Sequence, residues 1–281
     1  MTVAADGGRE WTTASIRRTM LTIIVIAAAY GAISRAVGLA SYDIESEYLP
    51  PEIATRGIYV FAVTAFIALA HDSPGPRGAT MSPASWSGDR MPPIVPGGVA
   101  LGSALMVLFE NNWDLDQRET ITGTVLFAMA FVACLFPYFV RTLRRQLSAA
   151  LLLLLGALML FLGEVIDHAD ILPESISEEG FELFGAIAVL WSFLLFAQRE
   201  MGAATHRLLL SDAIWPLLLG TSLFTVGNTL LMFNHGEWPP PWQMVEGAVL
   251  SIAGAVVLWR TTAEAVRMGR PIAGSSIHSA P

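Results

Sequence analysis

The stretch SAALLLLLGALMLFLGEVID, residues 148–167, decides the fold class of this chain. It carries no charged residue before Glu164 and is long enough to cross the hydrocarbon core of a bilayer, which takes about 20 mostly apolar residues. Similar stretches occur at 19–40, 57–71, 97–112, 121–140, 180–198, 208–233 and 243–260. We therefore predict an all-α, polytopic membrane helix bundle, with eight transmembrane helices arranged as four hairpins.

The composition agrees with a membrane protein. The 281 residues are 54% hydrophobic and only 14% charged, whereas soluble domains are about 25% charged. All 16 basic residues are arginine and the net charge is −8, which excludes a basic nucleic-acid-binding surface. The single cysteine, Cys134, excludes a disulfide framework and a cysteine zinc site. We expect the lipid bilayer, and not nucleic acid, to be the main partner.

The arginines predict an orientation. With eight spans, 13 arginines fall on one side, only Arg56 and Arg118 fall on the other, and Arg35 is the one arginine placed inside a span. By the positive-inside rule both termini are cytoplasmic, as in a multi-pass protein of a bacterial inner (plasma) membrane. The chain then divides into a cytoplasmic segment 1–18, a membrane bundle 19–263 with a Pro/Gly-rich cytoplasmic loop 72–96, and a cytoplasmic tail 264–281.

Acidic residues show the opposite distribution. The four predicted outer segments hold 17 acids and two arginines, a net charge of −15, whereas the inner segments sum to +6. The outer face is therefore where we look first for chemistry.

A candidate metal site lies in the third outer segment. Glu164, Asp167 and His168 are spaced i, i+3, i+4, so they share one helix face. Carboxylates and imidazoles that converge from neighbouring helices bind divalent metals such as zinc, iron or manganese. The predicted ligands are Glu164, Asp167, His168 and His235, and the predicted general bases at the start of the next helix are Glu178 and Glu182.

A solvated acidic rim is the alternative for this segment. Acidic residues that open a helix, such as Glu178 and Glu182, are favoured by the positive end of the helix dipole without any ligand. Glu164 and Asp167 instead lie at the end of a predicted helix, where the negative end of the dipole repels carboxylates. Because this placement is unfavourable without a bound cation, it favours the metal site.

The seventh stretch carries polar residues on one face. Thr221, Thr225, Asn228 and His235 are spaced by four, three and seven residues. They either form hydrogen bonds between helices or line part of a solute path that ends near His235. For Arg35 we expect an ion pair with an outer carboxylate such as Asp43 or Glu164.

Three functions fit these patterns. The first is a metal-dependent membrane hydrolase or transferase, the second a cation or proton transporter, and the third a non-catalytic subunit or scaffold that packs against other membrane subunits. Haem ligation by histidine pairs is less favoured, because His71, His168, His206 and His235 fall at span boundaries or in loops. The sequence predicts no substrate, since it contains no Walker loop, dinucleotide fingerprint, HExxH or GxSxG motif.

Overall fold

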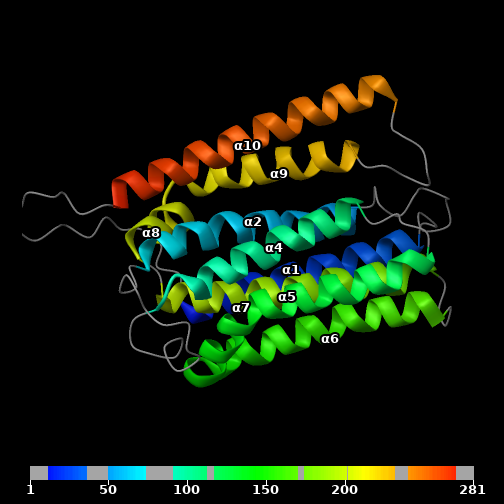
Figure 1. The fold of residues 1–281 in the computed structure, drawn as a ribbon, viewed down its shortest axis with the longest axis horizontal. Helices are drawn as coiled ribbons and strands as arrows, with labels where there is room; N and C mark the ends of the chain where they lie inside the picture. The colour runs from blue at the N-terminus through cyan, green and yellow to red at the C-terminus, as the bar shows by residue number, and fades with distance from the viewer. Residues whose placement is uncertain are drawn as a thin grey trace, which may run out of the picture.

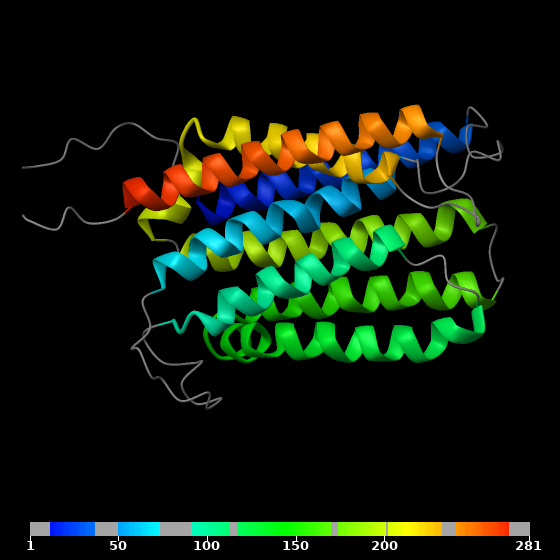
Figure 2. The same ribbon diagram turned by 45° about the horizontal axis from the view of Figure 1, so that its top comes forward.

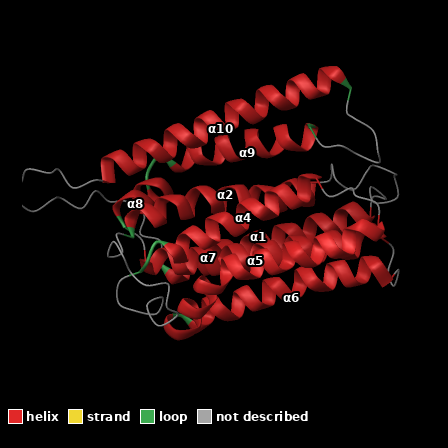
Figure 3. Cartoon of the chain, in the orientation of Figure 1, coloured by secondary structure: helices red, strands yellow, loops and turns green. Residues whose placement is uncertain are grey.

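The computed structural model describes residues 12–36, 50–73, 91–112, 117–169, 174–200, 202–231 and 240–269. Their regular structure is entirely helical, without strands (Figure 3). Eight long helices run side by side along the long axis, and one short helix, α8, lies across one end (Figure 1). The helices are α1 Thr13–Ala36, α2 Pro50–Asp72, α4 Ile94–Asn112, α5 Gln117–Arg145, α6 Leu147–Ala169, α7 Glu174–Glu200, α8 Ala203–Leu210, α9 Ile214–Leu230 and α10 Pro241–Gly269.

The all-α prediction is confirmed within the described residues, and seven of the eight predicted stretches each overlap one long helix, while 208–233 overlaps both α8 and α9. The number of membrane spans is not confirmed. By length and composition, three described helical segments could cross a membrane: Ile53–Asp72, Gly180–Glu200 and Pro241–Met268. The bent pair of α8 and α9 makes a fourth if it counts as one span. The apolar segments of α4 and α6, Ile94–Leu108 and Leu147–Gly163, are shorter than these.

The prediction of one continuous helix over 208–233 is wrong. The chain breaks at residues 211–213, and α8 and α9 meet at an angle of 78°. Asp72, at the end of α2, fixes α8 by accepting hydrogen bonds from the backbone N–H groups of Ala204 (3.0 Å) and Thr205 (2.7 Å). A Cβ added at Gly202 would lie 2.5 Å from the Asp72 carboxyl carbon, so the close approach requires glycine.

Three of the four predicted hairpins are present among the described residues. The pairs α4 and α5, α6 and α7, and α9 and α10 pack as neighbours. The first hairpin is wrong, because α1 packs mainly against α7, where its Ile16 and Met20 are buried with Leu194 and Leu195. Helix α2 instead occupies the centre of the bundle and contacts α4, α7, α8, α9 and α10 (Figure 2).

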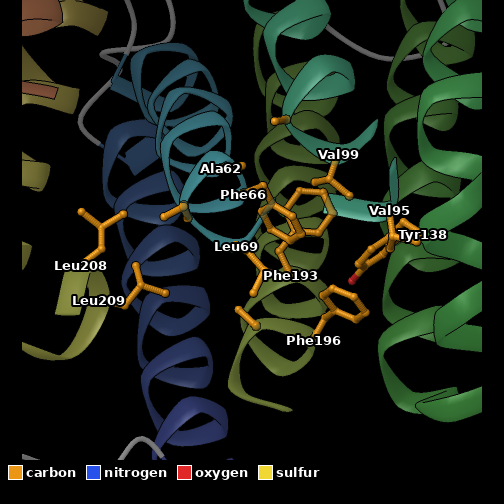
Figure 4. Close-up of a cluster of buried hydrophobic side chains, with 14 of the residues drawn as sticks. Ala62, Phe66, Leu69, Val95, Val99, Tyr138, Phe193, Phe196, Leu208 and Leu209 are labelled. Carbon is orange, nitrogen blue, oxygen red and sulfur yellow. The ribbon is translucent and has the colours of Figure 1, made fainter. Parts of the chain in front are cut away.

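An aromatic cluster joins α2, α5 and α7 in the main core (Figure 4). The ring of Tyr138 lies edge-on to Phe196 and Phe193, with centroids 4.8 and 5.4 Å apart, and Phe66 contacts Phe193 at 4.9 Å. Such edge-to-face contacts add to the stabilisation from buried apolar area. This core holds α2 in a fixed position beside α9.

Candidate functional site

The predicted metal site lies mostly outside the residues whose side chains are described. Glu164, Asp167 and His168 fall in the last turns of α6, and Glu178 and Glu182 in the first turns of α7. Of these side chains only Glu182 is described, as partly buried, and His235 lies outside the described residues altogether. No group of three or more His, Cys, Asp or Glu residues gathers elsewhere in the described part of the chain. The metal site therefore stays a prediction.

The predicted Arg35 ion pair also lies outside the described side chains, and two of the predicted histidines lie at the surface. Arg35 belongs to α1, but its side chain, like Asp43 and Glu164, is outside the described side chains. His71 and His206 are both exposed on α2 and α8.

The polar face of the seventh stretch points into the bundle. Thr221 and Thr225 are buried, and so is Thr229, one turn further along α9. Asn228 is not part of this row, because it is only partly buried; its amide nitrogen donates to the carbonyl oxygen of Phe224 at 2.9 Å. The buried row therefore consists of Thr221, Thr225 and Thr229, each four residues after the one before. The sequence prediction had Asn228 in place of Thr229.

A buried arginine faces this row from α2. Arg56 is 3% exposed, and its Nη1 donates to Oγ1 of Thr229 at 3.4 Å. The Thr229 hydroxyl in turn donates to the Thr225 carbonyl oxygen at 3.0 Å. Arg56 lies inside the candidate span Ile53–Asp72, so the prediction that Arg35 is the one arginine inside a span is wrong.

The α2–α9 seam is our name for Thr55 and Arg56 of α2 together with the three buried threonines of α9. The Thr225 hydroxyl faces α2, since a Cβ added at Gly57 would lie 3.8 Å from its oxygen. Several buried hydroxyls here have no hydrogen-bond partner within the described part of the chain: those of Thr55, Thr221 and Thr225 in the seam and that of Ser251 in the adjoining α10.

Two threonines elsewhere in the bundle differ from these, although the buried hydroxyl of Thr205 in α8 also has no partner within the described residues. Thr64 and Thr261 donate to the carbonyl oxygens of Val60 and Val257, four residues earlier in their own helices. A buried hydroxyl without a partner costs about 1–3 kcal/mol. Hydroxyls beside a guanidinium group are well suited to hold an anion, because all of these groups can donate hydrogen bonds to it.

A second buried polar region lies at the end of the bundle where α5 and α7 end. Arg141 is fully buried and binds both carboxylate oxygens of Glu200, with Nη2 at 2.8 and 2.9 Å. Tyr138 lies one turn before Arg141 on α5, and its hydroxyl donates to the Ser192 hydroxyl (2.8 Å), which in turn donates to the Ala149 carbonyl oxygen (2.6 Å). We call Tyr138, Arg141, Ser192 and Glu200 the α5–α7 clamp.

The clamp was not predicted from the sequence. Arg141 and Glu200 are 59 residues apart and were placed only among the inner charges, since no local pattern links them. Each group in the clamp has its partner in the protein, which identifies it as a structural element that joins α5, α6 and α7.

Comparisons with known proteins assign no function to these sites. No protein-family model matches the chain, and no curated protein or solved structure is significantly similar to it.

Proposed function

We propose that this chain is a membrane transporter in which the eight long helices span the bilayer and the α2–α9 seam binds a small anionic solute. The observation that carries the proposal is Arg56, a buried cation inside a candidate span, in the same seam as threonine hydroxyls that have no partner within the described residues. The hydrogen-bond donors of the seam, a guanidinium group and threonine hydroxyls, favour an anion over the cation or proton that the acidic outer face suggested.

The surface of α10 supports membrane embedding. Although its candidate span is apolar, only 11% of the apolar window in this span is buried within the bundle. Trp242 and Trp259 are both exposed and lie 17 residues apart, about 25 Å along the helix. This separation is close to the thickness of the hydrocarbon core, and tryptophans favour its two boundaries.

The distribution of arginines supports cytoplasmic termini. Many of the described arginines lie where α1 begins and where α5, α7 and α10 end, and these helix ends share one side of the bundle (Figure 1). At these helix ends lie Arg17, Arg18, Arg144, Arg145, Arg199, Arg260 and Arg267, and Arg207 belongs to α8 at the same end of the bundle. Under the positive-inside rule this end faces the cytoplasm.

The position of the seam supports binding inside the membrane. The buried row from Thr229 to Thr221 covers about 12 Å along α9, almost half of the hydrocarbon core. Arg56 itself lies three residues, about 4.5 Å, inside the candidate span of α2, and ionisable groups within a span are costly and usually functional.

Anion uptake into proteoliposomes tests the proposal. We expect the reconstituted protein to take up at least one of chloride, phosphate, acetate and succinate faster than empty liposomes. Arg56→Gln should abolish this uptake, and Arg56→Lys should keep part of it, because it retains the charge. Thr64→Val, a buried change whose hydroxyl is satisfied within its own helix, is the control for folding. Uptake of none of these anions, or uptake that survives Arg56→Gln, would contradict the proposal.

A further inference from the structure

A shallow groove of about 450 Å³ lies along α1, away from α7. We propose that it binds an anionic phospholipid of the leaflet at the arginine-rich end of the bundle. This inference rests on the membrane embedding proposed above but not on anion binding at the α2–α9 seam.

The groove changes from cationic to apolar along its length. Arg17 and Arg18 are exposed at one end, where two guanidinium groups can hold a phosphate by paired hydrogen bonds. The next two turns present Leu21, Val25 and Ile26, which are 49%, 65% and 63% exposed. This order of charge and then hydrocarbon matches a phospholipid headgroup followed by an acyl chain.

Helix α1 is held at the correct depth for such a lipid. Its opposite face is anchored by buried Ile16 and Met20, and the Thr13 hydroxyl donates to Oε1 of Gln198 at 3.2 Å. Gln198 precedes Arg199, which donates to the carbonyl oxygen of Arg145. Arg17 and Arg18 therefore lie close to the level of the other arginines, at the proposed membrane boundary.

Charge complementarity favours a lipid over the other occupants. Free phosphate would contact the arginines but leave the apolar half of the groove uncovered. A second copy related by a two-fold axis along the membrane normal would bring Arg17 and Arg18 next to the same arginines of its partner, which is repulsive. An anionic phospholipid neutralises the charge and covers the apolar turns at once.

Native mass spectrometry of the full-length protein in dodecyl maltoside tests the site. Dioleoylphosphatidylglycerol is added in one series, dioleoylphosphatidylcholine in a second and inorganic phosphate in a third. We expect the protein to retain phosphatidylglycerol in preference to phosphatidylcholine. The double variant Arg17→Gln/Arg18→Gln should weaken phosphatidylglycerol binding roughly tenfold or more, since each basic residue near an anionic headgroup contributes substantially.

Two further variants make the result specific. Arg260→Gln/Arg267→Gln removes the same charge from exposed positions on α10 at the same end of the bundle, and it should change binding less than about twofold. Val25→Ser/Ile26→Ser keeps the arginines and should weaken lipid binding without changing phosphate binding. Equal losses in the two arginine variants, no preference for phosphatidylglycerol, or phosphate binding as strong as lipid binding would each overturn the inference. Because none of these variants touches Arg56, anion uptake by the seam is expected to survive in all of them.

Discussion

The α5–α7 clamp and the α2–α9 seam each bury an arginine between helices, but they differ in what surrounds it. In the clamp, Arg141 binds both oxygens of Glu200, and the nearby Tyr138 and Ser192 hydroxyls are hydrogen-bonded. In the seam, Arg56 reaches Thr229, while neighbouring hydroxyls such as that of Thr225 have no partner within the described residues. We interpret the clamp as a structural element and the seam as the proposed ligand site.

The two regions should respond in opposite ways to the loss of a polar group. Removing one partner of a buried ion pair leaves an uncompensated charge and is strongly destabilising. Removing a hydroxyl that has no partner removes a desolvation penalty and little else. The following predictions, from the largest effect to the smallest, test this contrast.

Glu200→Gln should have the largest effect. It removes the carboxylate that binds the fully buried Arg141, so the free energy of unfolding should fall by about 3–5 kcal/mol. Unfolding in mixed detergent micelles measures this loss. Glu264→Gln, at an exposed position on α10, is the control and should be nearly neutral. Similar stability of the two variants would mean that the ion pair is not a structural clamp.

Gly227→Ala should be the next most damaging. A Cβ at this position of α9 would lie 2.4 Å from the backbone nitrogen of Ser251, so α9 and α10 would have to separate, at a cost of about 1–3 kcal/mol. Gly97→Ala in α4 is the control, because its Cβ would meet no atom within 4 Å. Thermal unfolding in detergent compares them, and equal melting temperatures would contradict the close helix contact beside the seam.

The smallest effects compare one hydroxyl from each region. Ser192→Ala removes two hydrogen bonds of the clamp and should cost about 1–3 kcal/mol. Thr225→Val, a change of similar size in the seam, should leave the unfolding free energy unchanged or raise it slightly. The same micelle unfolding assay applies. A loss for Thr225→Val as large as that for Ser192→Ala would show that the seam is as fully satisfied as the clamp.

The helix positions could be predicted because apolar length is a local property. The break at residues 211–213 could not, since it depends on Asp72, which lies more than 130 residues away and caps α8. The packing of α1 against α7 was also missed. Short connections favour neighbouring helices, but they do not determine which helix buries Ile16 and Met20.

The seam was only partly predictable. Helical spacing found Thr221 and Thr225 but chose Asn228, whose side chain bonds to its own helix, in place of Thr229. Arg56 was missed because a search for apolar residues ends a span at the first charge, and the predicted span began one residue later. The predicted ligands Glu164, Asp167, His168 and His235 lie outside the described side chains, so a metal-dependent reaction remains a separate hypothesis.

The most direct test of the seam as a ligand site is the rate of anion uptake by Thr225→Val proteoliposomes relative to Thr64→Val proteoliposomes. Both changes replace a buried threonine hydroxyl by a methyl group, but only the Thr64 hydroxyl is bonded within its own helix. Loss of a hydrogen bond to a charged solute should slow uptake by Thr225→Val about tenfold, with Thr64→Val close to the unmodified protein. Equal uptake by the two variants would contradict the account.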